Sequence, residues 1–336
     1  MRRITLIDVA AVSGYSVRTV KKVVSGNGYV SDNARTTILS AIEKSGYRKN
    51  EIASTLAKNK QHLILIIIRD LNVFLDESKR GFIRAADALA GFGIHIEFAQ
   101  VLDLSHQKKL LSDAAKRDNL SAVILHAISM HELDNEINTL VDSGVPVFTY
   151  NNDAPNSRRM SFLGPRAYES GRIGAQILAN YISQKGKVLV VNTYGDATQT
   201  QERTHGFIDK VKESYPEISF EDIRIPLNPQ TYYDTLKGIM LKEDIKALFC
   251  TDEHCLVAAD LLHDLDRKDV VLLGFDISEE SKELMRDGYL TIIVDQKTDY
   301  QSETLLRLVA DYLLFGRVPP PVVSTEVSIL ISEFLR

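Results

Sequence analysis

The sequence predicts an α/β protein in two parts, a small basic helical domain followed by a larger acidic body of two lobes. Charge separates the parts: residues 1–62 contain 11 Lys and Arg against 4 Asp and Glu, whereas the remaining 274 residues contain 29 against 41. From residue 63 onward, short aliphatic runs alternate with amphipathic stretches, as in parallel sheets whose strands are joined by helices. Because 274 residues exceed one comfortable hydrophobic core, we expect two lobes.

The first expected helix begins after Thr5. Thr5 and Asp8 form a capping pair, in which Thr5 accepts a hydrogen bond from the amide of Asp8 and the carboxylate lies at the positive end of the helix. Apolar residues recur three and four positions apart, so one face is buried. Ser13-Gly14-Tyr15 ends this helix, because Gly14 can adopt a left-handed conformation.

The second expected helix, capped by Ser16 and ended by Gly26, has two different faces. Three valines form an apolar stripe, and the opposite stripe carries Arg18, Lys21, Lys22 and Ser25. A basic stripe on a short helix after a glycine turn is typical of a recognition helix that enters the major groove of DNA. A third helix, capped by Ser31 and ending near Gly46, completes a modest core.

These residues resemble the DNA-binding domain of the lac-repressor (LacI) family. The resemblance rests on Ile4 to Ala10, Gly14, Ser16, Thr19-Val20, Val23-Val24, Val30-Ser31 and Gly46-Tyr47 through Asn50. It extends over the whole chain and implies a transcriptional regulator, most simply a repressor, that binds double-stranded operator DNA. The DNA contacts that it implies are Thr5, Ser16, Val17, Arg18, Lys21, Lys22, Ser25, Asn50, Ala53 and Leu56.

Two lysines of the second helix depart from the family pattern. Val17 and Arg18 stand where the family reads bases, and Lys22 stands where it usually has an Arg that contacts a base. Arg can grip guanine through two hydrogen bonds, whereas Lys is a point donor, so base readout at Lys22 differs. Lys21 replaces the usual Ser and adds a positive charge near the DNA backbone.

The resemblance also predicts a hinge helix from Asn50 to Ala57, which becomes helical on the operator. Eight residues rarely hold a helix alone, because nucleation is costly. In the family, the residue at the position of Leu56 wedges into the minor groove and kinks the DNA; the alternative is that Leu56 packs on the body. Here Lys49 replaces a frequent Pro, and Glu51 brings an anion close to DNA.

The aliphatic runs of the body are expected strands, at residues 63–68, 123–125, 145–150, 187–192, 247–250, 270–275 and 291–294. The family's body resembles periplasmic sugar-binding proteins, with two Rossmann-like lobes, three crossovers and a ligand in the cleft. We therefore expect a helix-turn-helix domain at 1–49, a hinge helix and linker at 50–62, and an effector-binding and dimerisation domain at 63–336. Its first lobe is expected at about 63–160 and 292–321, and its second at about 161–291 and 322–336.

Ligands of open α/β sheets lie beyond the carboxyl ends of the strands, so residues that follow the aliphatic runs are candidates. Arg203 is a further candidate, because it matches the family's Arg-x-x-Gly-Phe motif. The full set of candidates is Asn72, Phe74, Tyr150, Asn151, Asp153, Arg203, Asp252, Asp276 and Gln296. Planar, two-ended polar groups suit the neighbouring hydroxyls of a sugar or polyol, and aromatic rings cover its C–H face. Each polar residue has an alternative role as a loop cap, and His126 either faces the cleft or is a buried structural histidine.

Two further departures concern the pocket. Sugar binders often show Asp-Arg where this chain has Asn151-Asn152, and Asn-Asp where it has Thr251-Asp252. The pocket is therefore more neutral than that of simple pentose binders, and the sequence identifies neither the effector nor the direction of its effect on DNA binding.

Other functional classes lack their motifs. There is no Gly-x-Ser-x-Gly elbow, no phosphate-binding Gly-x-x-x-x-Gly-Lys-Ser/Thr loop and no His-x-x-x-His pair, so no enzyme, cofactor or metal site is expected. Asp252 and Asp276 could perform acid–base chemistry, but sugar hydroxyls recruit the same residues without catalysis. A free-standing receptor would not need the basic domain. A third alternative changes the signal to a nucleobase, a phosphorylated sugar or a partner protein; with Arg203 as the one confident cation, a phosphate is disfavoured.

Location and assembly follow from coarser features. No apolar run approaches the ~20 residues of a membrane helix, the start lacks the apolar core of a signal peptide, and the two cysteines suit a reducing compartment, so a cytoplasmic protein is expected. A two-half-site operator implies a homodimer, with an interface expected on residues 78–91 through Phe82, Ile83, Ala86 and Leu89. No C-terminal leucine-heptad helix follows the strand-like residues 327–331, so dimers rather than tetramers are expected.

Overall fold

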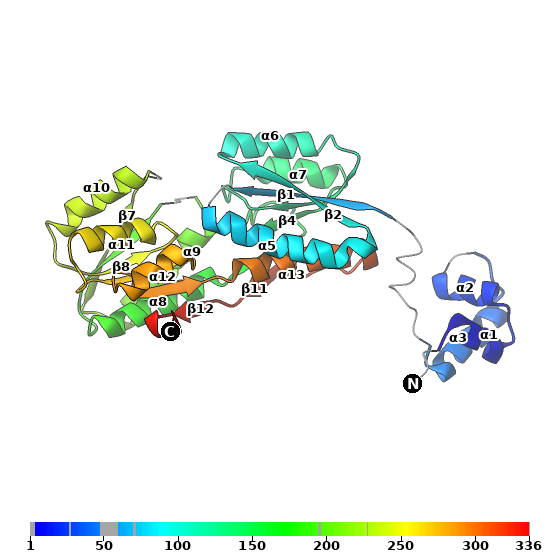
Figure 1. The fold of residues 1–336 in the computed structure, drawn as a ribbon. Coiled ribbons are helices and arrows are strands. Elements are labelled where there is room, and N and C mark those ends of the chain that lie inside the picture. The colour runs from blue at the N-terminus through cyan, green and yellow to red at the C-terminus, as the bar shows by residue number, and fades with distance from the viewer. Residues whose placement is uncertain are drawn as a thin grey trace. The chain divides into compact units, whose positions relative to one another are not determined.

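Figure 1 shows the fold of the chain in a computed structural model. The structure describes residues 4–26, 28–47, 60–69, 72–193, 196–226 and 228–335, without the side chains of residues 72 and 73. The chain divides into two compact units, Met1–Lys60 and Gln61–Arg336.

The first unit contains three helices, α1 (Leu6–Ser13), α2 (Val17–Ser25) and α3 (Asp32–Ser45), around a small core that includes Val9, Val20, Val23 and Ile38. The capping predictions for α1 and α2 are confirmed: Thr5 and Asp8 form a reciprocal capping box, and Ser16 accepts from the amide of Thr19. Ser31 occupies the predicted N-cap position of α3, although its side chain makes no capping hydrogen bond. All three helices end at a glycine in the left-handed conformation, which a Cβ would disfavour.

The second unit contains two six-stranded sheets, each covered on both faces by helices. The first sheet has the order β11-β5-β4-β3-β1-β2, and all its neighbouring strands are parallel. Its strands are β1 (His62–Arg69), β2 (Ile94–Val101), β3 (Leu120–Leu125), β4 (Val147–Tyr150), β5 (Ser161–Pro165) and β11 (Val322–Thr325). Helices α5 (Asn72–Leu89) and α13 (Thr298–Phe315) pack on one face, and α6 (Leu104–Ala114) and α7 (Asp134–Asp142) pack on the other.

The second sheet has the order β12-β10-β9-β8-β6-β7, with an antiparallel β12. Its strands are β6 (Gly186–Asn192), β7 (Ile218–Arg224), β8 (Ile245–Cys250), β9 (Val271–Phe275), β10 (Ile292–Asp295) and β12 (Ser328–Leu330). Helices α8 (Ala167–Tyr181) and α9 (Thr198–Ser214) cover one face. The other face carries α10 (Pro229–Met240), α11 (Cys255–Asp264) and α12 (Glu279–Arg286). Short 3₁₀ turns are formed by Ala90–Phe92 and Ser332–Leu335.

The chain passes between the two sheets three times, after β5, after β10 and after β11. The predicted lobe limits are wrong by one strand at each crossover: β5 and β11 belong to the first sheet, and β10 belongs to the second. The physical reason is that each strand completes its own sheet before the chain leaves it. Sequence patterns report the strand but not the sheet that it joins.

All seven predicted strands are present. Strands β2, β5, β7 and β11 were not predicted; β2, β7 and β11 lie at the edges of their sheets and expose several side chains to solvent. Their sequences therefore lack a continuous aliphatic run. Among the described helices, none has the length and hydropathy needed to span a membrane.

The helix that was expected to form the dimer interface, α5, packs one face against α13 and the first sheet. Phe82 is fully buried in that core, so its predicted role at an interface is wrong. Its neighbour Ile83 is 47% exposed, and Ala86 and Leu89 are half-buried. Phe82 and Ile83 are adjacent in sequence, and the helical period places only Ile83 on the outer face of α5.

Candidate functional site: an inter-lobe cleft and a basic helix face

The first unit presents a basic helix face to solvent. Of the described residues predicted to contact DNA, six are exposed and Lys22 is half-buried; the exposed ones are Thr5, Ser16, Val17, Arg18, Lys21 and Ser25. The opposite face of α2 is anchored in the core by Val20 and Val23. Lys22 runs past Gly28, where a Cβ would approach its side chain to 3.4 Å. Asn50, Ala53 and Leu56 lie outside the described residues.

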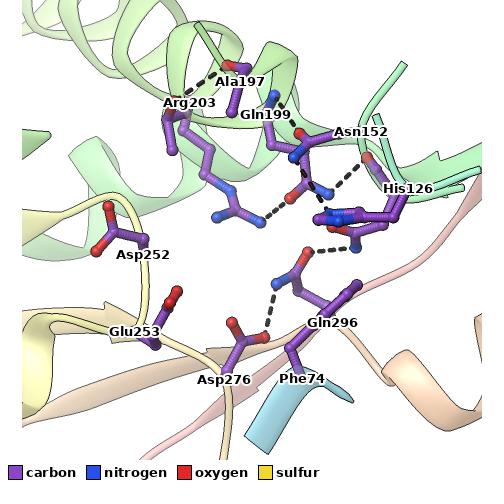
Figure 2. A pocket seen from close by; sticks show the side chains of 12 residues that line it. Phe74, His126, Asn152, Ala197, Gln199, Arg203, Asp252, Glu253, Asp276 and Gln296 are labelled. Carbon is purple, nitrogen blue, oxygen red and sulfur yellow. Dashed lines mark hydrogen bonds between the residues drawn. The ribbon is translucent and has the colours of Figure 1, made fainter. Parts of the chain in front are cut away.

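The second unit contains a cleft of about 380 Å³ between its two lobes (Figure 2). The first lobe contributes Phe74, His126, Asn151 and Asn152. The second lobe contributes Ala197, Gln199, Thr200 and Arg203 from the start of α9, Asp252 and Glu253 after β8, and Asp276 after β9; Gln296 follows β10. The cleft therefore lies at the carboxyl ends of the strands, where open α/β sheets bind ligands.

Six of the nine predicted ligand-binding residues line this cleft, namely Phe74, Asn151, Arg203, Asp252, Asp276 and Gln296. His126 also faces it. The side chain of Asn72 lies outside the described part of the structure. Tyr150 and Asp153 do not line the cleft.

Tyr150 is a buried support rather than a lining residue. Its hydroxyl donates to the carbonyl of Thr298 (3.1 Å) and hydrogen-bonds with Ser78 (3.0 Å). Its ring stacks on Phe74, with the ring centres 5.7 Å apart, and burial raises the pKa of its hydroxyl well above the usual value. Tyr150 therefore holds Phe74 in place from behind.

Asp153 anchors the loop that follows β4. Its Oδ2 accepts from Nη2 of Arg159 (2.6 Å), and its Oδ1 accepts from the hydroxyl of Thr149 (2.6 Å). The side chains of Asp153 and Arg159 are both at least nine-tenths buried. All the strong acceptors of Asp153 are thus used inside the first lobe, and the sequence-based assignment of this residue to the ligand is wrong.

A continuous chain of hydrogen bonds runs around the cleft. Gln296 donates to Oδ1 of Asp276 (2.6 Å), and Asn151 donates to Oε1 of Gln296 (3.3 Å). Gln199 in turn donates to the backbone oxygen of Asn151 (2.6 Å) and accepts from Nη2 of Arg203. We call Gln296, Asn151 and Gln199 the amide relay. Because Asn151 belongs to the first lobe and Gln199 to the second, the relay joins the lobes.

Two members of this chain have unusual backbones. Asn151 has φ = 61° and Asp276 has φ = 68°, in the left-handed region that Asn and Asp tolerate better than most other side chains. Both residues directly follow a strand. The left-handed turn directs each side chain to its partner in the relay instead of continuing the strand.

Three buried polar atoms at the cleft have no hydrogen-bond partner among the described residues: Nδ1 of His126, Nε of Arg203 and Oδ2 of Asp252. An unpaired buried polar group costs about 1–3 kcal/mol. Arg203 is otherwise held firmly, since Nη1 donates to the carbonyl of Thr251 (2.6 Å) and its guanidinium lies 3.7 Å from the centre of the Phe275 ring. A ligand with several hydrogen-bonding groups would satisfy all three atoms.

Burial changes the charges of the cleft. It lowers the pKa of His126 to about 3, so this imidazole is neutral at physiological pH, and it lowers the pKa of Arg203 to about 10. Burial also raises the pKa of Asp276 to about 7; Arg203 opposes this shift, whereas the negative charges of Glu253 and Asp295 increase it. Asp276 thus changes its ionisation near neutral pH.

Sequence reasoning missed Gln199, Thr200 and Glu253. The rule that favours residues directly after a strand does not reach Gln199, which lies in the first turn of α9, seven residues beyond the end of β6. Helical spacing offers the missing signal, because Gln199 is four residues before Arg203 and therefore lies on the same helix face.

The lobes also meet beyond the relay. The hydroxyl of Ser129, in the loop after β3, donates to Oδ2 of Asp196, in the loop after β6, and the amide of Met130 donates to the carbonyl of Asp196 (3.3 Å). The hydroxyl of Thr198 donates to the carbonyl of Asp153 (3.1 Å). Hydrogen bonds of this kind can be exchanged for bonds to water, so they are compatible with lobes that open and close.

Both units match known protein families. Residues 5–50 match the family "Bacterial regulatory proteins, lacI family", and residues 64–317 match "Periplasmic binding protein domain". This chain belongs to the lacI family of bacterial regulatory proteins. It is a DNA-binding transcriptional regulator with a periplasmic-binding-protein-like second domain.

Individual relatives of this lacI-family regulator agree. The chain is 26% identical over 287 residues to the ribose operon repressor of Bacillus subtilis (strain 168), covering 81% of each protein. It is 40% identical over 79 residues to catabolite control protein A of Priestia megaterium, covering 23% of this chain and 24% of that protein. Its fold resembles that of GanP, a glucose-galactose binding protein from Geobacillus stearothermophilus, with a TM-score of 0.76, 21% identity, and coverage of 82% of this chain and 99% of that one.

Proposed function

We propose that this lacI-family regulator is a cytoplasmic repressor without enzymatic activity, which binds a pseudo-palindromic operator as a dimer. A small sugar or polyol in the inter-lobe cleft controls it. The observation that carries the proposal is the cleft itself, where Nδ1 of His126, Nε of Arg203 and Oδ2 of Asp252 are buried without partners. The name of the ribose operon repressor, which matches over most of the chain, supports a sugar as the signal.

The amide relay suggests how the ligand acts on DNA binding. Asn151 is hydrogen-bonded to Gln296 and Gln199, and Gln199 to Arg203, so a ligand that binds Arg203 or Asp276 also changes the contacts between the lobes. A ligand shifts a conformational equilibrium only by its difference in affinity for the two arrangements. The relay offers such a difference, because its bonds between the lobes exist only when the lobes are close together.

The charges of the cleft argue against a phosphorylated sugar. Among the described residues that line it, Arg203 is the one cation, and Asp252, Glu253 and Asp276 are acidic. A phosphate would add a buried negative charge beside three carboxylates. Enzymatic chemistry is disfavoured because the hydroxyls of a sugar engage carboxylates without any reaction.

The function is tested by a thermal-shift screen of neutral, amino and phosphorylated sugars and of polyols, followed by fluorescence anisotropy on the promoter DNA upstream of the chain's own gene. We expect at least one non-phosphorylated compound to raise the melting temperature and to change the affinity for DNA tenfold or more, within the usual coupling range of 1–3 kcal/mol. Turnover of such a compound by the purified protein would overturn the non-enzymatic role. Stabilisation only by phosphorylated sugars would overturn the assigned class of ligand.

In the first unit, Arg18→Ala should weaken binding to the specific DNA site by about 1–3 kcal/mol and have much less effect on random DNA, because we propose that Arg18, which is exposed on α2, reads a base. Lys21→Ala is the matched control: it should weaken both complexes similarly and flatten the salt dependence, as expected of a phosphate contact. Anisotropy titrations at several salt concentrations separate the two cases. Equal losses on specific and random DNA for Arg18→Ala would contradict base readout.

We also expect sedimentation at micromolar concentration to give twice the chain mass of 37.6 kDa. Ile83→Asp should shift the protein toward monomers and weaken operator binding, because Ile83 is a half-exposed apolar residue on the outer face of α5. Leu102→Asp is the control, since Leu102 is 72% exposed outside this helix. A tetramer, or an unchanged dimer with Ile83→Asp, would count against an α5 interface.

A further inference from the structure

Acidic side chains gather on one side of the cleft. Asp252 and Glu253 follow β8, and Asp276 follows β9; these two strands are parallel neighbours, so their carboxyl ends lie at the same edge of the sheet. Figure 2 shows these three carboxylates along one side, with Gln199, Asn152 and His126 along the opposite side. The cleft is therefore polarised: one side offers carboxylates, and the other offers neutral groups.

The single cation that lines the described cleft does not pair with these carboxylates. Arg203 donates to the carbonyl of Thr251 and to the amide oxygen of Gln199, and it stacks on Phe275. Oδ2 of Asp252 has no partner, and Oδ1 of Asp276 accepts from a neutral amide, that of Gln296. Among the described residues, neither Oδ2 of Asp252 nor Oδ1 of Asp276 therefore accepts a hydrogen bond from a cationic group.

Burial, together with neighbouring negative charges, raises the pKa of two carboxyl groups at this cleft. The pKa of Asp276 is raised to about 7 by burial and by Glu253 and Asp295. The pKa of Glu77, on α5 in the first lobe, is also raised to about 7 by burial, with further contributions from Asp276 and Asp295. Carboxylates that repel one another are stabilised when a positive charge is placed between them.

We propose that the effector carries a protonated amino group beside its hydroxyls, as an amino sugar or amino polyol does. The ammonium binds Asp252 and Asp276, and the hydroxyls bind Arg203 and Gln296. This inference rests on the proposed function and specifies its ligand. An ammonium is a compact cation with three donors, so it can satisfy Oδ2 of Asp252 and reach a second carboxylate. A neutral sugar could make the same hydrogen bonds but would not compensate the negative charge of the carboxylates.

A divalent metal is a poorer occupant of this side. Asp252, Glu253 and His254 offer ligand atoms within 4.8 Å of one another. However, Oδ1 of Asp252 already lies 2.9 Å from Nδ1 of His254 and accepts from the His254 amide (3.0 Å). A metal bound through Nδ1 of His254 would have to break the hydrogen bond between His254 and Asp252.

The test compares matched ligands by isothermal titration calorimetry on the full-length protein at pH 7.5, with chelator present. The pairs are glucosamine with glucose and galactosamine with galactose; N-acetylglucosamine carries an uncharged, larger amide at the same carbon as the first amine. We expect an amino sugar to bind at least tenfold more tightly than its parent and than its N-acetyl form. A parent sugar that binds as tightly as its amine would overturn the inference but leave the proposed function standing. If none of these compounds binds, the inference is wrong, and the proposed function is then decided by the broader screen.

Variants separate charge recognition from general binding. Asp252→Asn should reduce the ratio of amine to parent affinity to about one, because the amide keeps the shape but loses the charge. Gln296→Leu should weaken amine and parent by the same factor, since it removes a neutral contact. Should Asp252→Asn fail to fold, Glu253→Gln at the same side should lower the ratio severalfold. An unchanged ratio in a folded Asp252→Asn protein would refute the assignment of the ammonium to this carboxylate.

Discussion

Replacing Arg203 with lysine should abolish the response to effector while DNA binding persists. The lysine keeps the positive charge but loses the planar guanidinium. In Arg203 this group donates two hydrogen bonds, to Thr251 and Gln199, and its Nε remains available to the ligand. Losing about two hydrogen bonds to ligand and relay, at about 1–1.5 kcal/mol each, should raise the effector Kd roughly 100-fold. Calorimetry measures this loss, and anisotropy measures the unchanged affinity for DNA without effector.

Arg159→Lys is the matched control for this experiment. Arg159 is also a buried arginine of the second unit, but it binds Asp153 and the carbonyl of Pro321 away from the cleft. Its replacement should lower the free energy of unfolding by about 1–3 kcal/mol and leave the effector Kd unchanged. If both variants reduced effector affinity equally, the loss would come from general destabilisation, and Arg203 would not be a ligand-binding residue.

Asp276→Asn should stabilise the empty protein and weaken effector binding. In the folded state the pKa of Asp276 is about 7, against an ordinary value of 3.8. Because the folded state holds this proton more tightly, stability falls as pH rises from about 4 through 7, and above pH 7 the buried carboxylate costs about 1–4 kcal/mol. Asparagine removes that cost, retains the bond from Gln296, and tolerates the left-handed backbone at φ = 68°.

The same variant should bind effector about 10- to 100-fold more weakly, because a charge-assisted hydrogen bond contributes about 1.5–3 kcal/mol. In the wild type, affinity should fall as pH drops below about 7, since protonation removes the acceptor charge; Asp276→Asn should lose this pH dependence. Thermal melts and calorimetry between pH 6 and 8.5 measure both effects. Asp153→Asn is the contrasting variant and should destabilise, because Asp153 is paired with Arg159. A destabilised Asp276→Asn with normal effector affinity would make Asp276 a structural residue.

Local signals in the sequence were sufficient for much of the fold. The caps at Thr5 and Ser16, the glycines that end the three helices, and the aliphatic runs of the central strands depend on residues a few positions apart. The same holds for the general location of the cleft, because the carboxyl ends of parallel strands meet at one edge. These features follow from short-range hydrogen bonding and burial.

The direction of each side chain at that edge was decided by tertiary structure. Tyr150 and Asp153 flank Asn151-Asn152, yet only the two asparagines reach the cleft. The left-handed backbone of Asn151 turns its side chain toward Gln296, 145 residues away. Gln199 lines the cleft because it lies in the first turn of α9. Strands β5, β10 and β11 join sheets that their sequences do not specify. The sequence by itself determined the helices of the first unit, the central strands of the sheets and the sheet edge at which a ligand is expected, since these depend on local periodicity. The relay, the unpaired buried atoms and the lobe crossovers depend on contacts between distant segments, and only the packed structure brings these together.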